Sequence, residues 1–314
     1  MPGYVSELPN VGDWFRALPL VYIVFIGICS VLFIAICVMI FFVLRDIHYY
    51  VPNEYVKSDL YFIAMIPVFV GFCCVGGNIL VRSSSILYAV GLTYLMICLH
   101  MAIILIIRLF GTRKGLANWL VEQQKDIVFD TKPYCCCCKC LPTTKVTVKR
   151  VRILSYCVRQ SPIIRILLQL ALIIMNVEGV TDQYSVTQVL NGIGVASALL
   201  AVYCSHILVT LTREKLEPYN MYTIFRCVNV TQMLFSLQKF FLDLIAKNGG
   251  MSGLSMAPPS VVSRFWFNVT MTFELAIVAY VMLKEMRPGK CGFFVDRPNP
   301  DARSNRIVPM TDII

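Results

Sequence analysis

Residues 17–44 read ALPLVYIVFIGICSVLFIAICVMIFFVL and contain no charged side chain. A helix needs about 20 apolar residues to cross the roughly 30 Å of hydrocarbon in a bilayer. The run therefore predicts a membrane-spanning helix. We expect it to be retained rather than cleaved, because the residues before it, which include Glu7, Asp13 and Arg16, do not form the basic leader of a secretory signal.

The composition of the whole chain agrees with a membrane protein. Hydrophobic residues make up 58% of the sequence and charged residues 15%, whereas a soluble domain has about 45–50% and about 25%. The net charge of +10 does not indicate a nucleic-acid partner, because the basic residues punctuate long apolar runs and do not form one face or domain. We expect the lipid bilayer to surround this chain, and we expect no nucleic-acid partner.

Further apolar runs follow, and the sixth run of the chain, residues 218–242, is interrupted by Arg226 and Lys239. We predict an all-α polytopic membrane protein with seven transmembrane helices. Pro67 should kink the second helix. The seven spans are expected near residues 17–44, 60–81, 83–107, 162–180, 183–212, 218–242 and 261–283.

The distribution of basic residues predicts the orientation. Short cytoplasmic loops carry an excess of Lys and Arg, and residues 108–161 hold 11 of them. With that loop inside, 21 basic residues fall on the cytoplasmic side and 4 on the other. We therefore expect an extracellular N-terminal segment (residues 1–16) and a disordered cytoplasmic tail (residues 284–314).

The same loop contains PYCCCCKCLP at residues 133–142. Structural disulfides are uncommon in the cytoplasm. A metal site is a weaker interpretation, because four contiguous cysteines cannot easily converge on one tetrahedral centre and no second pair or His lies nearby. Flanking lysines would hold the run near anionic headgroups, which favours S-acylation, although thiols without any role stay an alternative. The cysteines that we expect to carry lipid are Cys135, Cys136, Cys137, Cys138 and Cys140.

The sixth span carries a polar stripe, because its polar residues recur every three or four positions and so share one helical face. Such side chains are unfavourable in lipid, so the stripe should face the bundle or water. It would form either the wall of a solute path or a set of interhelical hydrogen bonds in which Lys239 pairs with Asp243; a misplaced helix is the third alternative. The stripe comprises Arg226, Asn229, Gln232, Ser236, Lys239 and Asp243.

Two further charges lie within expected spans. Glu274 is in the middle of the seventh, and its expected depth makes Arg226 a candidate partner. A proton-coupled role for Glu274 is a second interpretation. Arg165 is expected near the inner end of the fourth span, where its side chain can reach the headgroups.

Several features together resemble the organic solute transporter alpha-subunit family. A cysteine cluster lies between the third and fourth of seven spans and is followed by KRVRIL (149–154) and CVRQ (157–160). The last two spans, with Phe225 through Phe240 and with Glu274, are similar to that family's last two helices. The resemblance covers most of residues 60–290. It implies facilitated diffusion of sterols, bile-acid-like conjugates and other amphipathic organic anions, with a small single-span beta-type subunit as partner.

We therefore expect a membrane transporter, or a transporter subunit, for amphipathic organic solutes such as steroid or bile-acid-like conjugates and lipids. No enzymatic activity, catalytic residue, metal or cofactor is expected. The cell membrane is the expected location, with an endosomal membrane as alternative. Assembly into a homo- or hetero-oligomer is compatible with the sequence. A seven-helix receptor or a trafficking or signalling scaffold is the rival interpretation. The expected path residues are Arg226, Asn229, Gln232, Ser236, Lys239 and Glu274.

Overall fold

The computed structural model describes residues 9–127, 143–178, 184–254 and 257–294. Helices account for most of these residues. The strands among them form a short antiparallel pair, β1 (Asp126–Ile127) and β2 (Thr144–Lys145), in which Asp126 lies opposite Lys145.

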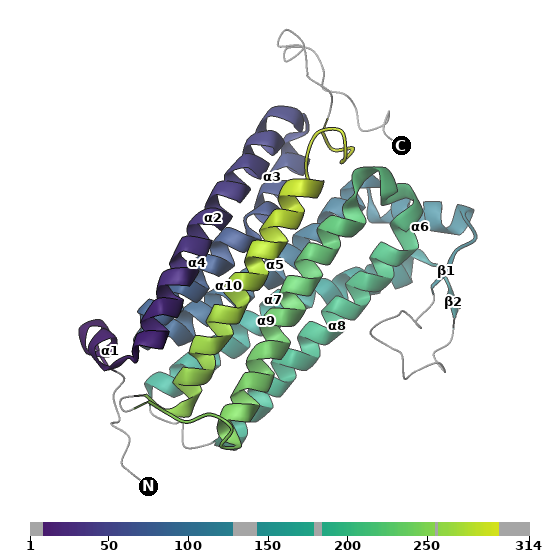
Figure 1. Ribbon diagram of the computed structural model, residues 1–314. Helices are drawn as coiled ribbons and strands as arrows, with labels where there is room; N and C mark the ends of the chain where they lie inside the picture. Colours follow the sequence, from purple (N-terminus) through teal and green to yellow (C-terminus); the bar gives the residue numbers. More distant parts are fainter. Residues whose placement is uncertain (1–8, 128–142, 179–183, 255–256, 295–314) are drawn as a thin grey trace.

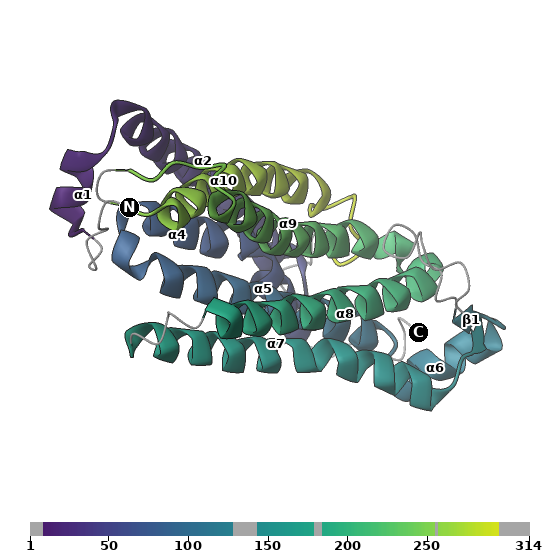
Figure 2. The same cartoon turned by 90° about the horizontal axis from the view of Figure 1, so that it is seen from below.

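Seven long helices, one of them in two pieces, form a bundle in the described part of the chain (Figures 1 and 2). Short 3-10 turns, η1 (Val81–Ser83) and η3 (Glu217–Tyr219), join two of the pairs. The long helices are α2 (Leu20–Tyr50), α3 (Glu54–Ala64) with α4 (Ile66–Ile79), α5 (Ser84–Leu109), α7 (Val148–Val177), α8 (Tyr184–Leu216), α9 (Met221–Lys247) and α10 (Pro259–Glu285).

The long helices alternate in direction along the chain. The short helix α1 (Val11–Ala17) therefore lies at one end of the bundle, whereas α6 (Arg113–Glu122) and the strand pair lie at the other (Figure 1). Helix α5 is central and contacts α3, α4, α7, α8 and α9. Helices α2, α4 and α10 pack together on one side of it, and α7 and α8 pack on one another on the other side (Figure 2).

Six of the long helices are apolar enough to cross a membrane, and in the described residues α9 is the long helix that is not. Its 27 residues give it the necessary length, but polar side chains interrupt it. An all-α polytopic membrane protein is thus confirmed. The count of seven spans and the orientation stay predictions, since they depend on α9.

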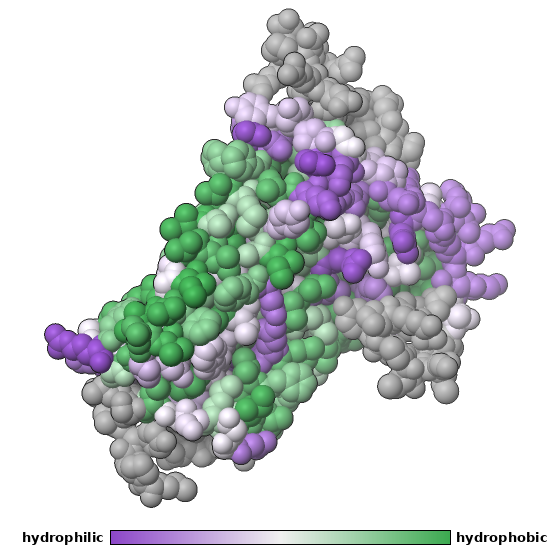
Figure 3. Space-filling view, viewed as in Figure 1, coloured by the Kyte–Doolittle hydropathy of each residue, from purple (hydrophilic) through white to green (hydrophobic). Residues whose placement is uncertain are grey.

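Apolar side chains cover the outer flank of the bundle (Figure 3). Helix α2 is the clearest case, because only 22% of its most apolar 18-residue window is buried. Val31, Ile34 and Phe41 are all more than 60% exposed there. Hydrophilic side chains gather at the α6 end (Figure 3). Such an apolar flank is suited to lipid and would be unfavourable in water.

The second expected span is broken. Helix α3 ends at Ala64 and α4 begins at Ile66, with Pro67 in its first turn. Proline fits a first turn because the N–H that it lacks has no partner there. The carbonyl of Phe62, next to the break, accepts a hydrogen bond from the Tyr94 hydroxyl group of α5 at 2.7 Å. The predicted kink at Pro67 is confirmed as a break that α5 supports.

The fourth long helix is longer than its expected apolar part. α7 begins at Val148, so its first turns contain basic residues that hydropathy places in the preceding loop. An apolar run marks the part of a helix that lies in hydrocarbon, and a helix can continue into water beyond it. Residues that were expected near the end of the fourth span therefore lie well inside α7.

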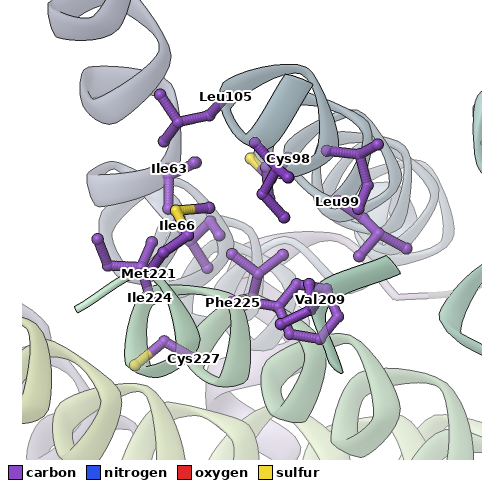
Figure 4. Packing of buried hydrophobic residues seen from close by; sticks show 14 of the residues in the cluster. Ile63, Ile66, Cys98, Leu99, Leu105, Val209, Met221, Ile224, Phe225 and Cys227 are labelled. Atoms are coloured by element: carbon purple, nitrogen blue, oxygen red, sulfur yellow. The ribbon is translucent and has the colours of Figure 1, made fainter. Parts of the chain in front are cut away.

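The first half of α9 contributes several residues to the main buried core. Ile224 and Phe225 of α9 belong to one buried apolar cluster with Leu99 of α5, Val209 of α8 and Ile63 of α3, and Phe225 lies beside Val209 (Figure 4). Ile224, Phe225 and Leu99 are each 1% exposed. Helix α9 packs on α10, α5 and α8, and this packing sets where its polar side chains point.

We expect Arg108→Ala to destabilise the protein more than Asp59→Asn. The Asp59 carboxylate is 1% exposed, and its Oδ2 lies 3.2 Å from Nε of Arg108. Removing Arg108 leaves a buried charge unpaired, which can cost about 3–5 kcal/mol, whereas the Arg108 side chain is 33% exposed and can turn to water. Thermal unfolding in detergent measures the difference.

The double variant Asp59→Asn/Arg108→Ala is the matched control and should recover most of the loss. Equal losses in the two single variants would contradict the assignment of the buried charge to Asp59.

Candidate functional site

The polar stripe of α9 faces the inside of the bundle over most of its length. Asn229, Gln232 and Lys239 are 3%, 1% and 8% exposed, and Ser236 is half-buried. Arg226 differs, because its side chain is exposed and its guanidinium lies 5.6 Å from the Tyr222 ring of the same helix. The enclosed part of the stripe thus runs from Asn229 to Lys239.

Gln232 joins three helices at the centre of the stripe. Its Nε2 donates to the Met96 sulfur of α5 at 3.4 Å, and the Ser161 hydroxyl of α7 donates to the same sulfur at 3.4 Å. Its Oε1 is buried and accepts no hydrogen bond. A buried amide oxygen without a donor is unfavourable, so this position offers an acceptor to a hydroxyl group.

A small cleft opens on the stripe between α8 and α9. Gln232 and Ser236 supply its polar lining and aliphatic side chains the rest. Its cavity of about 10 Å³ holds roughly one water molecule, whereas pockets for organic ligands measure about 300–1,000 Å³. The helices must therefore move apart before an organic solute can enter here. The aliphatic lining consists of Val195, Ala198, Leu199, Val202, Met233 and Leu237.

Lys239 pairs with Asp243 one turn further along α9. The Ser263 hydroxyl of α10 donates to the other Asp243 oxygen at 2.8 Å. The Lys239 ammonium also lies 5.7 Å from the centre of the Tyr88 ring of α5. The Lys239–Asp243 pair that the helical spacing allowed is confirmed, so the charge of Lys239 is largely balanced.

Glu274 pairs with Gln238 and not with Arg226. The Nε2 of Gln238 donates to Oε1 of Glu274, while the second carboxylate oxygen has no partner. Arg226 lies three turns of α9 away from Gln238, roughly 18 Å along the helix axis. The proposed Arg226–Glu274 pair is wrong. It assumed that the expected ends of the two spans lie at the same depth, whereas side-chain packing determines which residues of α9 and α10 lie opposite one another. Glu274 therefore lies beside α9 on its α10 face, away from the cleft.

Arg165 is also not where the sequence placed it. It is 5% exposed in the middle of α7, so it does not reach the headgroups from a helix end. Its Nε and Nη1 are buried without acceptors. The expected position was wrong because α7 begins well before its apolar part.

A group of polar residues that the sequence did not single out lies near α1. Asn268 of α10 donates to Oδ1 of Asn78 in α4 at 2.8 Å, and the indole of Trp14 donates to the Asn78 carbonyl at 3.2 Å. A Cβ at Gly77 would lie 2.9 Å from the Asn268 amide nitrogen, so glycine permits this close approach. Isolated Asn residues in apolar runs were the available signal.

The cysteine run from Cys135 to Cys140 lies outside the described residues. Its expected acylation stays a prediction.

Comparisons with known proteins agree on one family. The sequence profile described as Organic solute transporter Ostalpha matches residues 23–285. Organic solute transporter alpha-like protein 1 of Caenorhabditis elegans is 29% identical over 94% of this chain and 77% of the relative. Alpha-like protein 2 of the same organism is 23% identical over 99% and 92%, and alpha-like protein 3 is 30% identical over 62% and 56%. No solved structure matches the chain.

A double-mutant cycle between Gln238 and Glu274 should show a coupling free energy of about 1–3 kcal/mol, because a hydrogen bond to a charged group is broken. The variants are Gln238→Leu, Glu274→Leu and their combination, compared by free energy of unfolding in mixed micelles.

The matched cycle uses Arg226→Leu with Glu274→Leu and should be additive within about 0.5 kcal/mol. Strong coupling in the Arg226 cycle, with none in the Gln238 cycle, would contradict the observed packing of α9 against α10.

Proposed function

The chain belongs to the organic solute transporter Ostalpha family, and we propose that it moves amphipathic organic solutes across a membrane by facilitated diffusion. The family is one of membrane solute transporters. Steroid conjugates, bile-acid-like conjugates and lipids are the substrates that we propose. The observation that carries the proposal is the enclosed polar stripe of α9 in an otherwise apolar bundle.

The lining of the α8–α9 cleft supports an amphipathic substrate. Aliphatic side chains would contact a rigid hydrocarbon skeleton, and Gln232 with Ser236 would bond to its hydroxyl groups. The Ser236 hydroxyl, like Oε1 of Gln232, is buried without a partner. Both groups would gain a hydrogen bond from a bound solute, which compensates part of its desolvation. We propose Asn229, Gln232, Ser236 and Lys239 as the path.

We propose that the path opens between α8 and α9. Helix α8 packs much more extensively on α7 than on α9, so α7 and α8 can move as a pair while α9 stays with α10. Such a motion would enlarge a cavity that now has room for about one water molecule. Arg226, exposed near one end of α9, would attract anionic solutes to the path. Glu274, which was also expected to line the path, would act only through its hydrogen bond to Gln238 of α9.

The remaining proposals concern surroundings and partners. We propose seven spans in the cell membrane, with the N-terminus outside and the α6 end in the cytoplasm. The exposed apolar face of α2 is long enough to span the bilayer, and it would contact either lipid or a single-span beta-type subunit. Acyl chains on Cys135, Cys136, Cys137, Cys138 and Cys140 would hold the basic loop at the inner leaflet.

Tracer uptake tests the proposal. Cells that make this chain, with and without a single-span beta-type subunit, should take up a sulfated steroid. Uptake should become faster when the cells are preloaded with unlabelled compound, because a carrier returns faster when loaded. Gln232→Leu should slow uptake about three- to tenfold, the effect of one lost hydrogen bond of about 1 kcal/mol.

Ser205→Ala is the matched control, since that buried hydroxyl of α8 donates to the Val202 carbonyl of its own helix at 2.8 Å. It should leave uptake unchanged. No uptake under any pairing, with the protein present at the surface, would overturn the proposed function.

A further inference from the structure

Three cationic side chains from three helices surround Tyr88 of α5. Lys239 of α9 lies over its ring. Arg165 in α7 and Arg264 in α10 are the other cationic side chains near Tyr88. Arg264 donates to the Ser85 hydroxyl group, three residues before Tyr88 on α5, at 2.7 Å. These residues lie in the half of the bundle that contains α1. We call Tyr88, Arg165 and Arg264 the Tyr88 cluster.

The positive charges of this region exceed the negative ones. Asp243 is bonded to Lys239 and is 46% exposed at its side chain. Arg264 donates to the neutral Ser85 hydroxyl at 2.7 Å. Within the described residues, the ion pairs give neither Arg165 nor Arg264 an acidic partner. The Asp243 carboxylate is thus the counter-charge for three cations. About two positive charges, those of Arg165 and Arg264, are left unbalanced in this region.

The two arginines also hold free donors. Nε and Nη1 of Arg165, and Nε of Arg264, are buried and have no acceptor among the described residues. Unsatisfied buried donors of a charged group are costly. A neutral molecule could accept their hydrogen bonds but could not balance the charge. An anion with several oxygens would do both, because guanidinium groups bind carboxylate and sulfate oxygens in a fork.

The position of Arg165 depends on its neighbour in α8. A Cβ at Gly194 would lie 1.8 Å from Nη1 of Arg165 and 3.0 Å from its Cζ. Glycine at this position therefore provides the space in which the guanidinium lies, on the side of α7 that faces α8 and α5. Any larger side chain would displace the guanidinium without removing its charge.

We propose that the Tyr88 cluster is a subsite for the anionic group, carboxylate or sulfate, of an amphipathic solute. The proposal rests on the proposed function and names the residues that would read the charge of the solute. Arg165 and Arg264 hold the anion, and the Tyr88 hydroxyl donates to it. Lys239 is a weaker candidate because Asp243 already balances it, and Arg226 lies near the other end of α9.

Direct binding tests the subsite. The purified full-length protein, in neutral detergent, is titrated with a sulfated steroid and with its unsulfated parent. The wild type should prefer the sulfated compound. Arg165→Gln and Arg264→Gln should each weaken its binding about tenfold or more, the effect of one lost charge-assisted hydrogen bond, and leave the parent's affinity unchanged. Arg45→Gln, which removes an exposed cation of α2, is the control and should keep the preference.

Gly194→Ala extends the test without a change of charge. This variant should reduce the preference for the sulfated compound because the added methyl group displaces the Arg165 guanidinium. It replaces Arg165→Gln in the test if that variant does not fold. Equal weakening of both ligands in the folded variants would mean a structural role and would overturn the proposal. An unchanged preference would overturn it as well.

Thermal unfolding with inorganic sulfate separates the subsite from the transport function. Sulfate, compared with chloride at equal ionic strength, should stabilise the wild type and Arg45→Gln but not Arg264→Gln. If sulfate stabilises the protein in this way but no steroid uptake is measured, the anion subsite is supported and the proposed transport function is contradicted. Stabilisation by phosphatidic acid that the sulfated steroid does not displace would assign the cluster to a lipid phosphate and overturn the solute assignment.

Discussion

The polar side chains of α9 have to be enclosed, because hydrocarbon offers them no hydrogen-bond partners. The arrangement of the bundle follows from this constraint. Met96 and Tyr88 of α5 meet the buried part of the stripe, Ser263 of α10 completes the Lys239–Asp243 pair, and α8 covers Gln232 and Ser236. Apolar packing around Phe225 fixes the helix in place (Figure 4). The polar face of α9 is thus enclosed by α5, α8 and α10 and forms the candidate path.

The sequence predicts the long helices well, since each depends on its own residues. The uncharged run at 17–44 lies almost entirely in α2, and Pro67 marks the break before α4. The spacing of the stripe correctly predicted a buried face and the Lys239–Asp243 pair. The sequence could not predict contacts between helices, because these depend on how far each helix extends and how neighbours slide. Helix α7 begins earlier than expected, so Arg165 lies in its interior and inside the bundle. The packing of α9 on α10 brings Gln238, and not Arg226, next to Glu274.

The structure has no space for an organic solute in the α8–α9 cleft. Its α8–α9 cleft has polar groups that await a partner, yet space for about one water molecule. Helix α8 contacts α9 less extensively than it contacts α7, and we propose that the bundle opens between α8 and α9. Arg165 and Arg264 lie in the half of the bundle that contains α1, and we propose that they meet the charged end of a solute whose apolar body lies among the aliphatic side chains.

All of this requires that α9 crosses the membrane, and the position of the connection after it decides the question. A glycosylation acceptor inserted at Gly249-Gly250, combined with an epitope tag on the C-terminal tail, reports the side of both. If α9 spans the membrane, the acceptor is glycosylated and the tag is cytoplasmic. An unmodified acceptor with an extracellular tag would mean that the chain crosses without α9, and would contradict the enclosed path.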